Sequence, residues 1–259
     1  MICEAIVELS QSAVILKFPH ATKETQMATE LFTDIIDRFT NEKHFQVVAF
    51  GASNTERYMI GVHWTDVLDV CLKTRFGRKF HTINSGISGN NTREALARFD
   101  RDVAFFKPSC VIITLGGNDC NPKPEKWVSF DEFESNMTTI VTKVRDLGAI
   151  PVLQTYYAID HSEVEPARAE AFDKNMEIVR KVAADNNVHL VDQNALFAKA
   201  GLSVLRHKLL LNAMHVNQFG NMLIGVHLAS YFDCNPEKIG ERGMLLPAMS
   251  LYNQLKQLP

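Results

Sequence analysis

Five short apolar runs, separated by amphipathic stretches, constrain the fold of this chain more than any other feature. They lie at residues 46–50, 80–84, 110–115, 150–155 and 188–191 and are largely apolar throughout rather than alternating. Strands that are covered on both faces have this pattern, because neither face meets water. Helical segments between successive strands are typical of a parallel sheet. The sequence therefore predicts an α/β fold in which helices flank a five-stranded parallel sheet.

Two of the helices carry their own boundary signals. Ser129 and Glu132 have the spacing of a capping box, and Gly148 stands where that helix should end. A second helix is predicted to begin near Pro166, because proline favours the first helical turn. The apolar faces recur at helical spacing, through Phe133, Met137, Ile140, Val141 and Val144 in the first helix and Phe172, Met176, Val179 and Ala183 in the second.

We expect a single domain over residues 1–259, with a core at 46–233. The N-terminal extension, residues 1–45, is predicted to form a hairpin over 4–9 and 13–18 and then a helix through Leu31, Ile35 and Phe39. The tail, residues 234–259, is predicted to be poor in helix. It could pack along the surface or form a dimer contact, so a homo-oligomer stays open.

Composition argues against several classes of partner. The net charge of -3 gives no electrostatic reason to expect a nucleic acid. No apolar run approaches the ~18 residues of a membrane span, and no basic segment opens a signal peptide. The 5 cysteines are scattered and form no C-x-x-C pair, which argues against a zinc site and fits a reducing compartment. We therefore expect a cytoplasmic protein.

Polar residues and glycines follow the predicted strands, where an open parallel sheet binds its ligands. Ser53 follows the first strand, Gly89 the second and Asn118 the third, and His215 lies beyond the fifth. Each has an ordinary alternative: a turn before a helix, a glycine with positive φ, a turn-forming amide and a structural histidine. Together on one rim they supply a nucleophile, a base and oxyanion donors, which is the set that acyl transfer needs.

Three of these segments resemble blocks of the SGNH hydrolases, also called GDSL-type esterases and lipases. Ser53 in "GASNT" resembles the block usually written G-D-S-x-T, with Ala52 in place of the aspartate. Gly89 in "NSGISGNNT" and Asn118 in "GGND" match the second and third blocks. The resemblance covers roughly residues 45 to 230. It implies a three-layer α/β/α, flavodoxin-like fold and ester hydrolysis without a cofactor or metal.

The histidine block departs from the family pattern. His215 in "NAMHVNQFGN" is similar to D-x-x-H-P-N, but Asn212 replaces the aspartate and Val216 the proline. An asparagine can accept the imidazole proton through its carbonyl oxygen, although without the strength that a charge gives. We therefore expect a base with a weakened orienting partner. Asp192, just after the fifth strand, is the alternative partner.

The resemblance also implies a role for each block. Ser53 would be the nucleophile and His215 its base, and the helix after Ser53 would favour negative charge at its N-terminus. The backbone N–H groups of Ser53 and Gly89 and the side-chain amide of Asn118 would form the oxyanion hole.

Several functional hypotheses remain open at this point. The leading one is a serine esterase that acts on a small acyl or acetyl ester, including one on a carbohydrate. The rival is a non-catalytic relative that binds a glycan or acyl ligand in the same cleft. A phosphate-binding flavodoxin-like protein is weaker, because it gives His215 no role. Tyr156 and Tyr157, after the fourth strand, are candidate substrate-binding residues that either stack on a sugar or cover the sheet.

Overall fold

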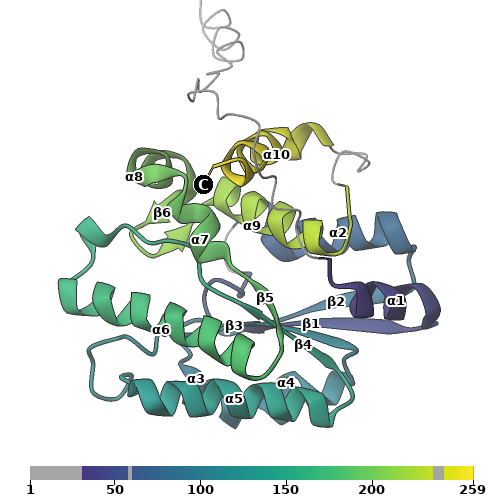
Figure 1. The fold of residues 1–259 in the computed structure, drawn as a ribbon, viewed down its shortest axis with the longest axis horizontal. Coiled ribbons are helices and arrows are strands. Elements are labelled where there is room, and N and C mark those ends of the chain that lie inside the picture. Colours follow the sequence, from purple (N-terminus) through teal and green to yellow (C-terminus); the bar gives the residue numbers. More distant parts are fainter. Residues whose placement is uncertain (1–30, 58–59, 236–241, 259) are drawn as a thin grey trace, which may run out of the picture.

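A five-stranded parallel sheet forms the centre of the molecule (Figure 1). The computed structural model describes residues 31–57, 60–235 and 242–258. The strands follow one another in the order β2-β1-β3-β4-β5. Their bounds are β1 Phe45–Gly51, β2 Phe80–Gly86, β3 Cys110–Thr114, β4 Ile150–Gln154 and β5 His189–Val191. The predicted α/β fold and its parallel sheet are confirmed.

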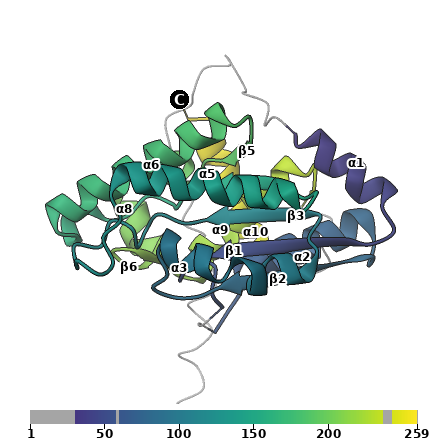
Figure 2. The same cartoon turned by 90° about the horizontal axis from the view of Figure 1, so that it is seen from below.

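Helices cover both faces of this sheet, which gives three layers (Figures 1 and 2). One face carries α1 Thr33–Asn41, α2 Trp64–Phe76, α7 Gln193–Ala198, α9 Gln218–Tyr231 and α10 Arg242–Lys256. The other carries α3 Thr92–Ala97, α4 Phe99–Asp102, α5 Phe130–Asp146 and α6 Pro166–Asp185. In the described part of the chain, no helix has the length and apolar character that crossing a bilayer requires.

Successive residues of the central strands enter opposite cores. In β1, Val47 and Ala49 pack with the α2 and α9 layer, whereas Val48 and Phe50 pack with the α5 and α6 layer. All four side chains are fully buried. This is why the strands read as continuous apolar runs, since a strand covered on both faces needs no polar side.

The carboxyl ends of the first three strands lie level with one another. Gly51 at the end of β1 pairs with Gly86 of β2 and with Thr114 of β3. In this order the connection from β1 runs toward β2, whereas the connection from β3 runs toward β4, so the two connections diverge between β1 and β3. Such a point of a doubly wound sheet leaves a crevice at the strand ends, where ligands bind.

A small second sheet lies beyond α8 Gly201–Val204 and a π-helical turn at Leu205–Leu209. Its two antiparallel strands are β6 Leu210–Asn212 and β7 His215–Val216, and Asn212 pairs with His215. α9 follows directly, and the Asn217 side chain caps it by accepting from Phe219 N–H and Gly220 N–H. The histidine segment is therefore a hairpin that is fixed to the start of a buried helix.

The helix signals in the sequence are largely confirmed. α6 begins at Pro166, and its predicted apolar face is buried. At α5, Ser129 accepts from the Glu132 N–H at 3.3 Å, but the Glu132 carboxylate binds Arg93. The predicted capping box is therefore only half formed, because an arginine offers a charged partner for that carboxylate.

The two ends of the chain differ from the prediction to different degrees. The hairpin expected over 4–9 and 13–18 lies outside the described residues. α1 buries Ile35 and Phe39 as expected, whereas Leu31 precedes the helix and is 38% exposed.

The prediction of a helix-poor tail is wrong, because α10 spans Arg242–Lys256. It packs on α9 and buries Leu245, Ala248, Met249, Tyr252 and Leu255. These positions have helical spacing, which outweighs the breaking tendency of Pro247 in the second turn.

Candidate active site

Ser53, His215 and Asn212 form a hydrogen-bonded row at the rim of the sheet. His215 Nε2 lies 3.0 Å from Ser53 Oγ, and His215 Nδ1 lies 3.0 Å from Asn212 Oδ1. Ser53 comes from the turn after β1, and the other two come from the β6–β7 hairpin. This is the geometry of a hydroxyl nucleophile, a base and a residue that orients the base.

The amide of Asn212 is held in one orientation by the backbone. Its Oδ1 accepts from Met214 N–H and from His215 N–H, each at 3.0 Å, as well as lying against His215 Nδ1. Two backbone N–H groups require an acceptor, so the oxygen and not the Nδ2 must face them. Nδ1 of His215 therefore carries the proton, and Nε2 is left as the acceptor for Ser53.

Burial lowers the pKa of His215 below its ordinary value of 6.5, and the positive charge of Arg168 lowers it further. The ring is therefore neutral at pH 7, which is the state in which it can take a proton from Ser53.

Two expectations about the surroundings of this row are not met. Asp192 points elsewhere: it caps α7 and accepts from Arg180 Nε at 2.7 Å. Ser53 lies in a turn in which Thr55 N–H and Glu56 N–H bond to Ala52 O, and the next helix of the described chain begins only at Trp64. Asp192 is thus excluded as the orienting partner, and no helix N-terminus lies at Ser53.

The second and third motif segments meet beside the Ser53 turn. Asn118 Nδ2 donates to the backbone oxygen of Asn90 at 2.9 Å. Gly89 has φ +77, and a Cβ there would meet no atom within 4 Å, so its requirement for glycine is conformational. Among the described residues, the N–H groups of Ser53 and Gly89 have no hydrogen-bond partner. Both donors are therefore available to an oxygen from outside the protein.

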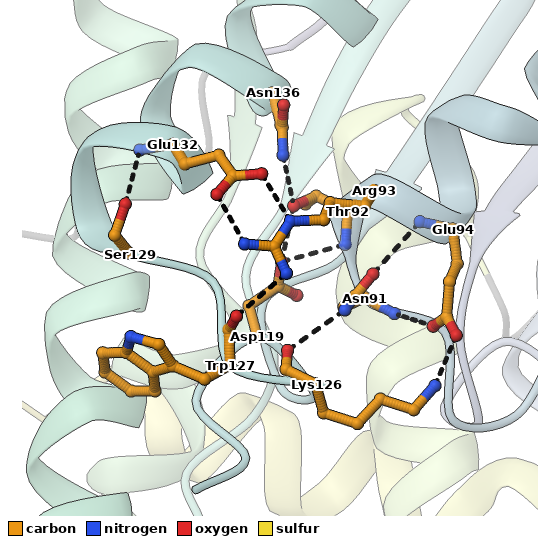
Figure 3. Close-up of polar contacts among 10 residues, drawn as sticks. All are labelled: Asn91, Thr92, Arg93, Glu94, Asp119, Lys126, Trp127, Ser129, Glu132 and Asn136. Carbon is orange, nitrogen blue, oxygen red and sulfur yellow. Dashed lines mark hydrogen bonds and ion pairs between the residues drawn. The ribbon is translucent and has the colours of Figure 1, made fainter. Parts of the chain in front are cut away.

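Side-chain hydrogen bonds from residues outside the family motifs hold the loop after β2 (Figure 3). Lys126 Nζ donates to the backbone oxygen of Gly89 at 3.1 Å and to Glu94 Oε1 at 2.5 Å. The other oxygen of Glu94 accepts from Asn91 N–H at 2.9 Å, while Asn91 Nδ2 donates to Lys126 O at 3.0 Å. The peptide groups on both sides of Asn90 are thus fixed by side chains from α3 and from the segment before α5.

Asp119 links the same helix to the Asn118 turn (Figure 3). Its Oδ1 accepts from Thr92 N–H at 2.9 Å and from Thr92 Oγ at 2.5 Å. The carboxyl group is fully buried, and this burial raises its pKa to about 6, although the bonds from Thr92 oppose the shift. Asp119 therefore fixes the Asn118 turn against the start of α3 from inside the protein.

Arg98 joins the carboxyl ends of β1 and β2 to the loop that follows β2. Its guanidinium donates to Gly51 O at 2.7 Å, to Ser85 O at 2.9 Å and to Asn90 Oδ1 at 2.6 Å. The side chain is buried and lies over the Phe50 ring. Buried carbonyl groups at the ends of strands need donors, and a guanidinium can serve several at once. Arg98 lies at the junction of α3 and α4, and its sequence context gives no signal of this role.

Tyr156 and Tyr157 do not overhang the cleft. They are 4% and 1% exposed, and each packs against a core phenylalanine, Phe172 and Phe197 respectively. Their side chains belong to the hydrophobic core beside the sheet. Of the two alternatives, stacking on a sugar or covering the sheet, the burial of both tyrosines favours the second.

A pocket opens next to Ser53 and His215. It holds about 380 Å³ of space, part of which is open solvent. Segment 60–63 forms one wall, and Gln218 and Asn221 of α9 form another. A ligand bound in this pocket would therefore lie beside both the Ser53 hydroxyl and the His215 ring. In the described part of the chain, no cluster of His, Cys, Asp or Glu has the composition of a metal site.

Known proteins share this arrangement of segments. The profile of the GDSL-like lipase/acylhydrolase family matches residues 49–222. The chain is 30% identical over 148 residues to an acetylxylan esterase of Geobacillus stearothermophilus, which covers 55% of this chain and 67% of that protein. It is 33% identical over 120 residues to an uncharacterized lipoprotein, YqeF, of Bacillus subtilis (strain 168). That match covers 42% of this chain and 47% of the lipoprotein, so the chain spans about half of that relative.

Solved structures agree in fold. A catalytic mutant of Axe2, an acetylxylan esterase from Geobacillus stearothermophilus, superposes with a TM-score of 0.65 at 23% identity, over 76% of this chain and 97% of that one. The acetyl xylan esterase AlAXEase gives a TM-score of 0.63 at 24% identity, over 72% and 98%. With the family profile covering most of the described sheet and its rim, this chain belongs to the GDSL-like lipase/acylhydrolase family, the SGNH carboxylic ester hydrolases.

Proposed function

We propose that the protein is a serine esterase that removes acetyl or similarly short acyl groups from a carbohydrate. The observation that carries the proposal is the row Ser53–His215–Asn212, in which a neutral imidazole lies 3.0 Å from a serine hydroxyl. The acetylxylan esterase relative supports the acetyl group and the carbohydrate, and the pocket beside Ser53 and His215 supports binding of the ester at these two residues.

In this mechanism Ser53 Oγ attacks the ester carbonyl carbon while His215 Nε2 takes the hydroxyl proton. The same proton then passes to the leaving alcohol oxygen, and an acyl group remains on Ser53. His215 next takes a proton from water, whose oxygen attacks the acyl carbon, and returns that proton to Ser53 Oγ. Asn212 holds the ring throughout through its bond to Nδ1.

Three donors would stabilise the oxyanion that forms in each step. They are the Ser53 and Gly89 N–H groups and the side chain of Asn118. One hydrogen of Asn118 Nδ2 binds Asn90 O, and this leaves the second hydrogen for the substrate oxygen. Loss of one such donor lowers kcat by about a hundred- to a thousandfold, which is the size expected for Asn118→Ala.

The test combines a substrate series with an active-serine probe. We expect hydrolysis of p-nitrophenyl acetate and of acetylated xylo-oligosaccharides, with kcat/KM falling steeply as the acyl chain lengthens to octanoyl. A fluorophosphonate should label Ser53, and peptide mass spectrometry should locate the label. Ser53→Ala should abolish both hydrolysis and labelling.

The rival function predicts the opposite result. A folded protein that is neither labelled nor active on any ester would be a non-catalytic relative that binds its ligand in the same cleft. Labelling at a residue other than Ser53 would contradict the assignment of the nucleophile.

A further inference from the structure

The hydroxyl group of Tyr157 connects the two halves of the candidate active site. Tyr157 Oη accepts from Val216 N–H at 3.0 Å and lies 2.8 Å from the backbone oxygen of Met214. Met214 and Val216 are the two neighbours of His215. The same oxygen lies 2.6 Å from Oδ1 of Asn54, the residue that follows Ser53. One buried phenol therefore contacts the nucleophile turn and both sides of the histidine.

The phenol has a single hydrogen, so it donates to Asn54 Oδ1 or to Met214 O at any moment and accepts from Val216 N–H in either case. Asn54 is held from a second direction, because Trp64 Nε1 donates to its backbone oxygen at 2.8 Å. Trp64 and Tyr157 are both 1% exposed. The turn that carries Ser53 is thus fixed against a rigid part of the core.

The histidine segment needs such support more than a segment with a charged partner would. Asn212 orients His215 through neutral hydrogen bonds, which are weaker than those of a carboxylate. A neutral partner restrains the ring less, so the backbone at 214–216 has to set its position. Proton transfer from Ser53 requires the two side chains to stay within hydrogen-bond distance, and small displacements are costly.

From these contacts we propose that Tyr157 is a positioning residue: its hydroxyl holds the Ser53 turn and the His215 segment in register, in support of the uncharged Asn212. The proposal rests on the proposed esterase function. It replaces the expectation that Tyr157 binds substrate with a role behind the reacting groups.

Tyr157→Phe tests the role, and Tyr156→Phe is a matched control. Both tyrosines are buried, but the Tyr156 hydroxyl has no hydrogen-bond partner among the described residues. We expect Tyr157→Phe to lower kcat on p-nitrophenyl acetate by ~10- to 100-fold, while KM stays within about twofold, because positioning acts on the chemical step. The rate of fluorophosphonate labelling should fall by the same factor. Tyr156→Phe should leave all three quantities unchanged.

A second background separates positioning from a general loss of structure. The Asn212→Asp variant has a charged partner that restrains the ring by itself, so Tyr157→Phe should cost at least ~3-fold less in kcat there than in the natural chain. A merely structural role would cost the same factor in both backgrounds. All variants are compared at a temperature where circular dichroism shows each one fully folded.

The outcomes distinguish this proposal from the proposed function. If the unaltered protein shows neither hydrolysis nor labelling, the esterase assignment fails. If it is active and Tyr157→Phe matches it in kcat and labelling, or if Tyr156→Phe loses as much, the positioning role is overturned while the esterase stands. An effect confined to KM would also overturn it, because Tyr157 would then act on substrate binding.

Discussion

Asn212 is the residue on which the strength of the candidate base depends. Its Oδ1 faces two backbone N–H groups and the imidazole, so the neutral side chain is held in the orientation that gives His215 the Nδ1–H tautomer. Asparagine in this position fails when it selects the wrong tautomer, and here the backbone prevents that. What the site lacks is the negative charge that would stabilise the imidazolium during proton transfer.

Asn212→Asp should therefore raise kcat, by about fivefold if the charge adds about 1 kcal/mol to the hydrogen bond. It should also raise the pKa of His215, because a nearby negative charge favours the protonated ring. In the natural chain burial and Arg168 keep this pKa below 6.5, so the acidic limb of kcat/KM should lie below pH 6.5. Only the neutral ring acts as a base, so this limb should move to higher pH in Asn212→Asp. Profiles of both proteins on p-nitrophenyl acetate check this, and an unmoved limb with an unmoved rate would show that residue 212 does not act on His215.

At the scale of elements, the loop after β2 is held by α3 and by the segment that leads into α5. Lys126 donates to the Gly89 carbonyl. Glu94 accepts from the Asn91 N–H, and Asp119 accepts from Thr92 at the start of α3 (Figure 3). The loop has a glycine with φ +77, so it could relax to other conformations without these bonds. The ion pair at Lys126 thus restrains a backbone donor that the proposed mechanism uses.

Lys126→Met should lower kcat by ~3- to 10-fold, which is less than Asn118→Ala, because it loosens a donor rather than removing it. KM should change little. Lys123→Met is the matched control: it removes a lysine from the same segment, at an exposed position, and should leave kcat unchanged. Steady-state kinetics on p-nitrophenyl acetate measure kcat for both variants. Equal losses of kcat in the two variants would show that the effect comes from removing surface charge and not from loosening the loop after β2.

For the whole molecule, stability and catalysis depend on different parts. The core between the sheet and the α2, α9 and α10 layer takes in the C-terminal helix, where Leu255 is fully buried. The row Ser53–His215–Asn212 lies at the strand ends, on a turn and a hairpin. A substitution in the buried face of α10 should accordingly lower the stability of the fold without changing kcat.

Leu255→Ala should reduce the free energy of unfolding by about 2–5 kcal/mol, since it removes a buried side chain and leaves a cavity. Leu246→Ala, in the same helix but at a position that is 50% exposed, should change it by less than about 0.5 kcal/mol. Urea denaturation measures both values, and kcat at 25 °C should be unchanged in each variant. A Leu255→Ala protein as stable as the natural chain would contradict the packing of α10.

The sequence by itself determined the parts of this protein that depend on local pattern. The five strands and the helices at Phe130–Asp146 and Pro166–Asp185 were predictable, because burial on two faces and helical periodicity are visible in neighbouring residues. The four separated segments around Ser53, Gly89, Asn118 and His215 were identified by their places after the strands and by the family resemblance. The C-terminal helix was missed, because the strong local signal of Pro247 obscured the periodic apolar positions around it.

Only the tertiary structure decided how the segments support one another. Tyr157 lies far from both Asn54 and Val216 in the sequence, and Lys126 far from Gly89, yet single side-chain atoms join them. The orientation of the Asn212 amide depends on the turn of a hairpin, and the removal of Asp192 from the site depends on Arg180. A hydrogen bond requires a donor–acceptor distance within a few tenths of an ångström and a suitable angle. Residue type and spacing do not specify either quantity, because both depend on the backbone positions that the packed core fixes.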